Sequence, residues 1–452
     1  MTKSGMVCPK WIFHCHFRQL DIRSKPSRLG SATPAAGRPS ITTGRECDMR
    51  HSPKCTTTAM PNAASLWPAF GLGLAIAVGN GLARFSYALL LPAMREDLAW
   101  TYAQAGWLNT ANALGYILGA ASGYFLLRHA SPARLFSWGL WLTLAALPLT
   151  GLHGSLASLT AARAAAGIGA AWVFSCGTAL IAARYPETDG RRGTAMGVFF
   201  AGAGLGIGLS GLVVNPLLAW SGSQGWPAAW LWLGALALLL SVWPLKEALK
   251  VQRVSNAPAR GALSLRGMRM ALLGYFAFAA GYIVYMTFIL AWLHTQHGSW
   301  QLSTLVWLVL GIGVSLSPFA WRRALEHWPP ALTLSASCTA TWAGTVIPLL
   351  NAHAAGLLAS ALVFGLGMFI APSAIAVLVR QKLPAPQLAK GMTLFTVVFS
   401  VGQAIGPVAA GWIADEQTLR QSLLFGSGLL LAGTLLPLLG LDRKFDSPGG
   451  QG

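Results

Sequence analysis

Charged residues are scarce in this sequence, and acidic ones are the scarcest. Only 10% of the 452 residues are charged, and 13 Asp and Glu stand against 32 Lys and Arg. With 54% hydrophobic residues, this composition excludes an ordinary soluble domain. Six cysteines in a chain of this length indicate no disulfide framework. The sequence also lacks H-E-x-x-H and Walker-type phosphate-binding motifs, and has no G-x-S-x-G in a strand context, which argues against an enzyme or an ATP-driven pump.

Long apolar runs fill the sequence instead. A helix needs roughly 20 residues to cross about 30 Å of hydrocarbon at 1.5 Å per residue. Twelve stretches approach or exceed this length, at 67–92, 104–127, 135–152, 155–182, 193–219, 228–245, 268–293, 302–321, 331–350, 354–379, 391–414 and 421–441. The expected fold class is an all-α polytopic membrane protein with twelve transmembrane helices.

The positions of the basic residues check this count independently, because loops on the cytoplasmic side of a membrane collect Lys and Arg. With the first helix running outward, the inner loops and C-terminal tail hold 18 Lys and Arg, whereas the outer loops hold only Arg95 and Arg420. A missed helix would break this alternation. We therefore expect both termini on the cytoplasmic side. The orientation rule also explains the net charge of +19 without a nucleic-acid partner.

The first 60 residues differ from the rest of the chain. They are polar, basic and without periodicity, and their longest apolar patch, WIF (11–13), is too short for a signal peptide. We expect residues 1–60 to form a disordered basic tail, unless translation begins at Met60 and the tail is never made. Its Cys and His residues match no standard zinc spacing, so we expect no metal site.

The sequence also repeats itself. At a shift of 198 residues, Gly167 aligns with Gly365, Gly204 with Gly402 and Gly208 with Gly406. This pattern predicts two pseudo-symmetric six-helix halves, at 61–245 and 268–442. A cytoplasmic linker (246–267) joins them, and a short cytoplasmic tail (443–452) follows the second half. Parallel repeats of this kind place a substrate path at the interface of the halves, near the middle of the bilayer.

Several motifs in these helices resemble those of the major facilitator superfamily (MFS) over nearly the whole chain. They are LTAARAAAGIGAA (159–171), GAGLGIGLSG (202–211) and GQAIGPVAAG (402–411). The segments GNGLARFSYALLLPAMREDL (79–98) and QAGWLNTANALGYILGA (104–120) resemble the YbfB/YjiJ-type bacterial subgroup in particular. Two departures stand out: the fifth helix lacks the Gly-Pro pair of exporters, and the loop after the second helix lacks the expected acidic residue near Leu127.

The resemblance implies a secondary transporter of a small molecule in the bacterial cytoplasmic membrane rather than an enzyme. We also expect a monomer without a cofactor. The resemblance also implies a role for Arg163 in proton coupling and leaves Arg128 as the basic residue of a cytoplasmic gate. Without a carboxylate inside any predicted span, co-transport of a protonated anion, exchange of two anions and facilitated passage all stay open.

Arg84 is the most informative single residue, because it lies inside an otherwise uncharged run and an arginine at this depth costs several kcal/mol. Asn80, Arg84 and Tyr87 share a helical face. We expect substrate contacts from this face and from neighbouring helices, at Asn109, Asn112, Tyr116, Arg163, Tyr282, Tyr285 and Gln403. The planar guanidinium suits an organic anion. Alternatively, Arg84 snorkels to the interface and Arg163 braces neighbouring helices.

Rows of small residues indicate where helices pack closely. We expect hinge or packing roles at the glycines of helices four, five and eleven and at one proline: Gly167, Gly204, Gly208, Gly402, Gly406 and Pro407. Two other functions compete with anion transport. Aromatic stripes and the glycine-rich fifth helix favour an exporter of hydrophobic or drug-like compounds, and a lipid-modifying membrane enzyme is the alternative of another class.

Overall fold

The structure, a computed structural model, describes residues 65–152, 154–186, 190–251, 267–296, 298–384 and 387–440. The chain divides into two units, residues 1–62 and residues 63–452, and every described residue belongs to the second. The predictions for the N-terminal tail, for most of the linker and for residues 443–452 therefore lie outside the described residues.

The described residues are almost entirely helical and contain no strand. In chain order the helices are α1 (Trp67–Ile76), the π-helix η1 (Ala77–Phe85), α2 (Tyr87–Asp97), α3 (Tyr102–Leu126), α4 (Pro132–Leu152), α5 (Leu156–Arg184), α6 (Arg192–Ser221), the short 3-10 helix η3 (Ser223–Gly225), α7 (Trp226–Leu249), α8 (Arg269–Thr295), α9 (Trp300–Ala320), α10 (Arg322–His327), α11 (Pro330–Leu350), α12 (Ala354–Met368), α13 (Ala371–Lys382), α14 (Leu388–Glu416) and α15 (Leu419–Leu439).

The predicted spans coincide with these helices to within a few residues at nearly every end. Ten helical segments of the described chain are long and apolar enough to cross a membrane. The other two predicted spans fall on α3 and α11, which are 25 and 21 residues long but are not among those ten. The all-helical polytopic fold is thus confirmed, and the count of twelve stays a prediction for these two helices.

Four helices that begin at the predicted outer face start with a hydroxyl N-cap. Thr101, Ser155, Ser299 and Thr418 each accept a hydrogen bond from the backbone N–H three residues on. At Thr101 the side chain of Gln104 accepts a hydrogen bond from the backbone N–H of Thr101, which completes a capping box. Such caps pair donors that the first turn of a helix leaves without a partner.

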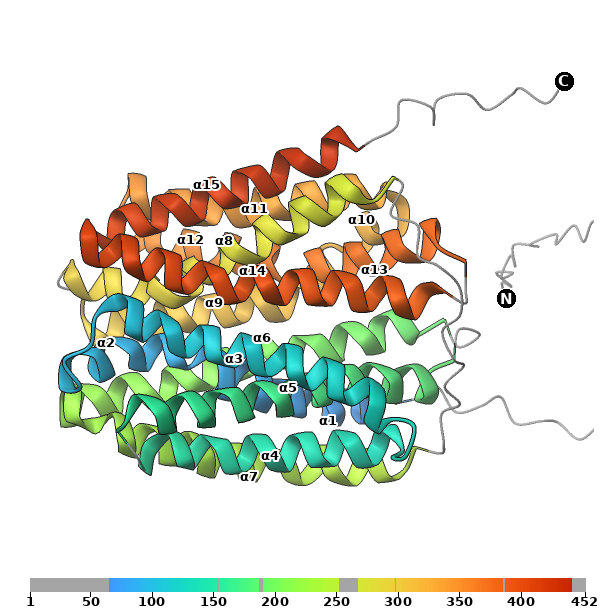
Figure 1. Ribbon diagram of the computed structural model, residues 1–452, viewed down its shortest axis with the longest axis horizontal. Helices are drawn as coiled ribbons and strands as arrows, with labels where there is room; N and C mark the ends of the chain where they lie inside the picture. The colour runs from blue at the N-terminus through green and yellow to red at the C-terminus, as the bar shows by residue number, and fades with distance from the viewer. Residues whose placement is uncertain are drawn as a thin grey trace, which may run out of the picture. The chain divides into compact units, whose positions relative to one another are not determined.

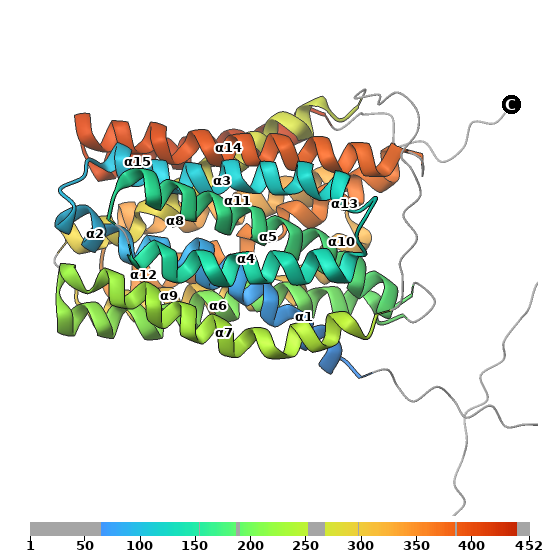
Figure 2. The ribbon, with the colours of Figure 1, turned by 60° about the horizontal axis from the view of Figure 1, so that its bottom comes forward.

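The two halves of the chain form two groups of helices. In Figure 1 the helices from α1 to α7 (blue to green) lie together, and those from α8 to α15 (yellow to red) lie beside them. Within each group the pairing is dense, as between α4 and α5 or between α8 and α15. Contacts between the groups run mainly through α6 with α9 and α3 with α14, and Figure 2 shows the second pair side by side.

Two predicted single spans are broken. The first consists of α1, η1 and α2, so that a π-helix occupies its middle. The tenth ends as α12 at Met368 and resumes as α13 at Ala371, with Pro372 in the first turn of the new helix. The first and seventh spans are the most enclosed, since the apolar windows of Trp67–Asp97 and Arg269–Thr295 are 100% and 94% buried.

Candidate functional site: a cavity between the two halves

A cavity of about 820 Å³ lies between the two groups of helices. The first half contributes residues of η1, α3, α5 and α6, and the second half residues of α8, α9, α10, α12, α13 and α14. Arg84 lines it in η1, and Arg192, Arg322 and Arg380 line it at helix ends that the charge pattern predicts to be cytoplasmic. The cavity therefore leads from the middle of the first span to one face of the membrane domain.

Arg84 is buried, with 6% of its surface exposed, and it contacts the opposite half of the protein. Its Nη2 donates to Oε1 of Gln403 at 2.7 Å. Gln403 in turn donates through Nε2 to the hydroxyl of Tyr282. The guanidinium also lies over two rings of the first half, with Cζ 5.4 Å from the Tyr116 centroid and 5.8 Å from that of Phe85. All these partners are neutral.

The backbone around Arg84 departs from the α-helix. The N–H of Ser86 bonds to the carbonyl of Gly81, five residues back, which is the π-helical spacing. The Ser86 hydroxyl donates to the carbonyl of Leu82, four residues back. π-helical segments occur frequently at functional sites.

Arg163 of α5 supports the same stretch of backbone. Its Nη1 donates to the carbonyl of Ala83 and its Nη2 to the carbonyl of Arg84 at 3.2 Å. It is 1% exposed, and its Cζ lies 5.0 Å from the ring of Tyr87 and 5.6 Å from that of Trp230. Arg163 therefore lies behind the cavity wall and holds the backbone that carries Arg84.

The predicted site residues separate into two sets. Five line the cavity: Asn80, Arg84, Tyr116, Tyr282 and Gln403. The other five lie outside its lining, where they bond within the helix packing: Tyr87, Asn109, Asn112, Arg163 and Tyr285.

The bonds of the second set show what these side chains do. Tyr87 donates to the carbonyl of Ala105 at 2.7 Å, and Asn112 donates to that of Arg163 at 3.0 Å. Asn109 reaches Thr287 in the other half at 2.7 Å. Tyr285 bonds to Ser360 at 2.6 Å, and its ring stacks on Phe364. Their assignment to substrate binding stays a prediction, and the lining supports it less well than for the first set.

Tyr282 belongs to an aromatic wall whose other two members, Tyr275 and Phe399, were not assigned to the site from the sequence. Phe399 of α14 lies between Tyr275 and Tyr282 of α8, with ring centroids 4.8 and 5.8 Å away and interplanar angles of 23° and 18°. All three line the cavity, and Phe174 and Phe200 line it on the side of the first half. Tyr275 and Tyr282 lie seven residues apart, a helical spacing that was visible in the sequence, but the same spacing occurs wherever helices pack or face lipid.

The cavity lining is short of negative charge. Glu326 is the one acidic residue among the described lining residues, and it pairs with Arg322 at 2.8 Å. The described residues hold no group of three or more His, Cys, Asp or Glu arranged to bind a metal ion. The electrostatic character of the cavity is therefore set by arginine.

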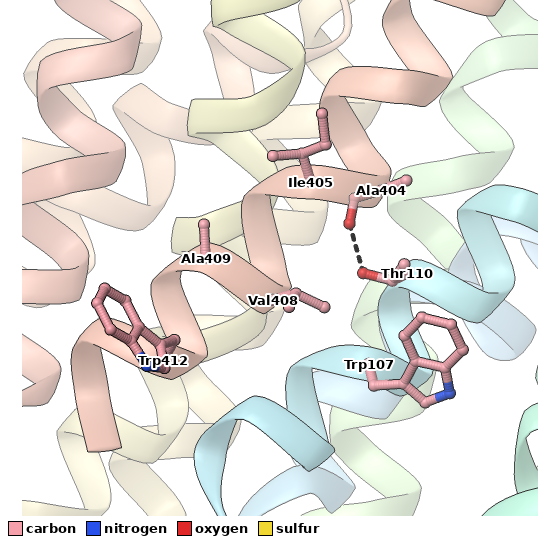
Figure 3. A pocket seen from close by; sticks show the side chains of 7 residues that line it. All are labelled: Trp107, Thr110, Ala404, Ile405, Val408, Ala409 and Trp412. Carbon is pink, nitrogen blue, oxygen red and sulfur yellow. Dashed lines mark hydrogen bonds between the residues drawn. The ribbon is translucent and has the colours of Figure 1, made fainter. Parts of the chain in front are cut away.

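The end of the molecule away from the cavity mouth is closed where α3 meets α14. The carboxylate of Asp415 accepts hydrogen bonds from the backbone N–H groups of Tyr102 and Ala103, at 2.7 and 2.8 Å. About two turns further along α3, Thr110 donates to the carbonyl of Ala404 at 2.5 Å, as Figure 3 shows. Asp415 thus caps a helix of the opposite half, because it pairs donors at the N-terminus of α3.

Figure 3 also shows a shallow apolar pocket over this contact, with Trp107 and Trp412 at its two sides. Both indoles are substantially exposed, at 37% and 62%. Its lining is apolar apart from Thr110 and the two indole N–H groups, of which that of Trp107 donates to Thr160 at 3.0 Å. It is an outward surface of the helix pair rather than part of the central cavity.

The predicted packing glycines lie at close helix contacts. A Cβ placed on Gly204 would lie 2.1 Å from the carbonyl oxygen of Gly311, across the contact of α6 with α9. Equivalent close approaches occur at Gly167, Gly402 and Gly406, and a looser one at Gly208. Pro407 lies within α14, which continues without a break. These contacts explain why small residues are needed there, and the hinge role stays a prediction.

Arg128, predicted to act at a cytoplasmic gate, is exposed just beyond the end of α3. Its guanidinium lies 5.5 Å from the rings of both Tyr124 and Phe125 of its own helix. A gating role for it also stays a prediction.

Residues 76–438 match the family described as "Uncharacterised MFS-type transporter YbfB". The chain is 29% identical over 256 residues to the uncharacterized MFS-type transporter YceJ of Bacillus subtilis (strain 168), covering 54% of this chain but only 64% of that relative. It is 28% identical over 377 residues to a chloramphenicol resistance protein of Streptomyces lividans, covering 80% of this chain and 93% of that protein.

Solved structures show the same fold at low identity. A bacterial homologue of the human lysosomal transporter Spinster, in an inward-facing and unoccupied conformation, aligns with a TM-score of 0.62 and 17% identity, over 83% of this chain and 96% of that one. A mutant of the nucleoside transporter NupG aligns with a TM-score of 0.63 and 12% identity, over 83% and 100%.

Proposed function

Since this chain belongs to the YbfB-type family of MFS transporters, we propose that it moves a small organic anion by alternating access between its two halves. Family membership confirms the resemblance seen in the motifs and makes the protein a multi-pass membrane transporter. The family and the fold are those of transporters rather than enzymes. The observation that carries the anion proposal is Arg84, bonded to Gln403 of the other half in a cavity lined by both.

The charge balance around Arg84 supports an anionic ligand. An arginine at the centre of a membrane helix costs about 2.5–3.5 kcal/mol on insertion scales. Among the described residues, none of the ion pairs includes Arg84, and its hydrogen-bond partner and nearby rings are neutral. An arriving carboxylate or phosphate would compensate this charge.

The geometry of the guanidinium supports the same conclusion. It has five N–H donors, and Gln403 accepts at one nitrogen, Nη2. Arginine recognises carboxylate and phosphate by pairs of parallel hydrogen bonds, whereas a lysine ammonium is a point charge. The link from Arg84 through Gln403 to Tyr282 joins η1 to α14 and α8, so a ligand at Arg84 would touch both halves.

The membrane and coupling assignments are further proposals. The Lys and Arg distribution supports a bacterial cytoplasmic membrane location with both termini inside. We propose a monomer without a cofactor. For proton coupling, the position of Arg163 on the backbone of η1 supports an indirect role at most, since it lies outside the cavity lining.

The test is a thermal-shift screen of purified full-length protein in detergent against small carboxylates, phosphates, sugars and uncharged aromatics. A ligand at 100 times its Kd should stabilise by about 2.7 kcal/mol. We expect an anion to stabilise the wild type and Arg420→Ala, a control at an exposed outer helix end, but not Arg84→Ala. If Arg84→Ala responds to the anion as the wild type does, the arginine is structural and the anion proposal fails.

Export of hydrophobic, drug-like compounds is the second candidate function. The relative named as a chloramphenicol resistance protein supports it, and so does the wall of Tyr275, Phe399 and Tyr282. In the same screen, an uncharged aromatic that stabilises both the wild type and Arg84→Ala would favour this function over anion transport.

A further inference from the structure

We infer that the cavity takes an aromatic carboxylate, meaning a flat ring with its acid group within one or two bonds of the ring. This inference rests on the proposed function, because it names the class of anion that would bind at Arg84. It is carried by a different observation, the aromatic wall beside that residue.

The anion-binding group and the wall are connected by direct contacts. Arg84 bonds to Gln403, Gln403 bonds to the Tyr282 hydroxyl, and the Tyr282 ring stacks beside Phe399 at 5.8 Å. Only Gln403 therefore separates the Tyr282 hydroxyl from the Arg84 guanidinium along this chain of hydrogen bonds. A carboxylate on Arg84 would bring the atoms next to it against Tyr282 and Phe399.

The arrangement of the rings favours a flat partner. Phe399 is nearly parallel to both Tyr275 and Tyr282. On the first-half side of the cavity, Tyr116 packs edge-on against Phe174 at 6.4 Å. The rings of the wall stack on one another and on Phe278, so a bound aromatic ring would meet their remaining faces and edges. Such a contact adds roughly two- to tenfold in affinity beyond buried area. A saturated ring of equal size gains only the area term.

The charges of the lining disfavour organic cations and dicarboxylates as ligands. An organic cation would meet Arg84 directly, and the one acidic lining residue among those described, Glu326, is paired with Arg322. A dicarboxylate would place its second charge against the aromatic wall, where burial without a partner is costly. The arginines at the mouth, Arg192, Arg322 and Arg380, would raise the local concentration of anions.

The experiment compares three probes of similar size by isothermal titration on the full-length protein in detergent: benzoate, cyclohexanecarboxylate and benzamide. We expect benzoate to bind most tightly, cyclohexanecarboxylate two- to tenfold more weakly, and benzamide at least tenfold more weakly than benzoate. In Phe399→Leu, benzoate and cyclohexanecarboxylate should bind equally, because the stacking face is lost.

The outcomes separate this inference from the proposed function. If cyclohexanecarboxylate equals benzoate in the wild type, the aromatic class is wrong while anion binding stands. If benzamide equals benzoate, or if none of the probes binds, the aromatic carboxylate is wrong, and equal binding of benzamide also contradicts the anion proposal. The melting temperature without ligand shows whether Phe399→Leu is folded. If this variant is not folded, the order of the three affinities measured on the wild type decides whether the ligand is an aromatic carboxylate.

Discussion

Removing the Asp415 carboxylate is expected to open the outer end of the protein. Asp415 lies on α14 of the second half, and its two oxygens accept from Tyr102 and Ala103 at the start of α3 in the first half. These bonds exist only while the outer ends of the halves meet. They therefore stabilise the present conformation against one in which the outer ends are apart.

The size of this effect follows from the geometry. Losing an N-cap side chain costs about 0.5–2 kcal/mol, and Asp415 is exposed, which places it away from the buried extreme. For Asp415→Ala we take about 0.5–1 kcal/mol, which corresponds to a shift of roughly 2- to 5-fold toward the outer-open state. Asp415→Asn should give a smaller shift, because one amide oxygen can still accept.

Pulsed electron–electron spin resonance can measure this shift. Spin labels at Leu152→Cys and Leu350→Cys, at the outer ends of α4 and α11, report the separation of the halves, and both positions are well exposed. The native cysteines would be replaced. We expect one short distance in the parent protein and an added longer one in Asp415→Ala.

Glu416→Ala is the matched control, since Glu416 is the exposed acidic neighbour of Asp415 and has no described hydrogen bond to α3. It should leave the distance distribution unchanged. Identical distributions for Asp415→Ala and the parent would refute the reasoning that this carboxylate holds the outer end closed.

Three other changes test the packing. Arg163→Ala should lower the free energy of unfolding by about 3 kcal/mol, measured by thermal denaturation, because two buried carbonyls lose their donor; an unchanged melting temperature would contradict this. Gly204→Ala should cost about 1–3 kcal/mol and reduce transport by forcing α6 and α9 apart, whereas Gly428→Ala, with no atom within 4 Å of its added methyl group, should do neither. Tyr285→Phe should lower stability by about 1 kcal/mol and leave anion affinity unchanged; a clear loss of affinity would place Tyr285 in the site.

The helices could be predicted from the sequence because their signal is local. Apolar length and the distribution of Lys and Arg require no knowledge of partners, and the observed helices begin and end close to the predicted residues. The breaks in the first and tenth spans were not predicted. In the first span, Arg163, far away in the sequence, bonds to the carbonyls of Ala83 and Arg84. In the tenth span the signal is local, since Pro372 lies in the first turn of α13.

The candidate site was predicted only in part, because the shape of the first span could not be read from local sequence. Asn80, Arg84 and Tyr87 share a face only if the first helix is α-helical throughout. In the π-helix at Ala77–Phe85 the backbone hydrogen bonds span five residues instead of four. Tyr87 lies outside the cavity lining, and its hydroxyl donates to the carbonyl of Ala105. An unexplained charge identified Arg84, but nothing local distinguished the aromatic wall from ordinary helix packing.

The most direct test of Arg84 as the anion-binding residue of a transporter is an exchange assay in proteoliposomes. The anion that gives the largest thermal shift, labelled outside and unlabelled inside, reports passage without knowledge of the coupling ion or of the direction of net transport. We predict exchange by the wild type and by Arg420→Ala. Arg84→Ala, shown to be folded by its melting curve, should give no more exchange than vesicles without protein. Exchange by Arg84→Ala at the wild-type rate would contradict the account.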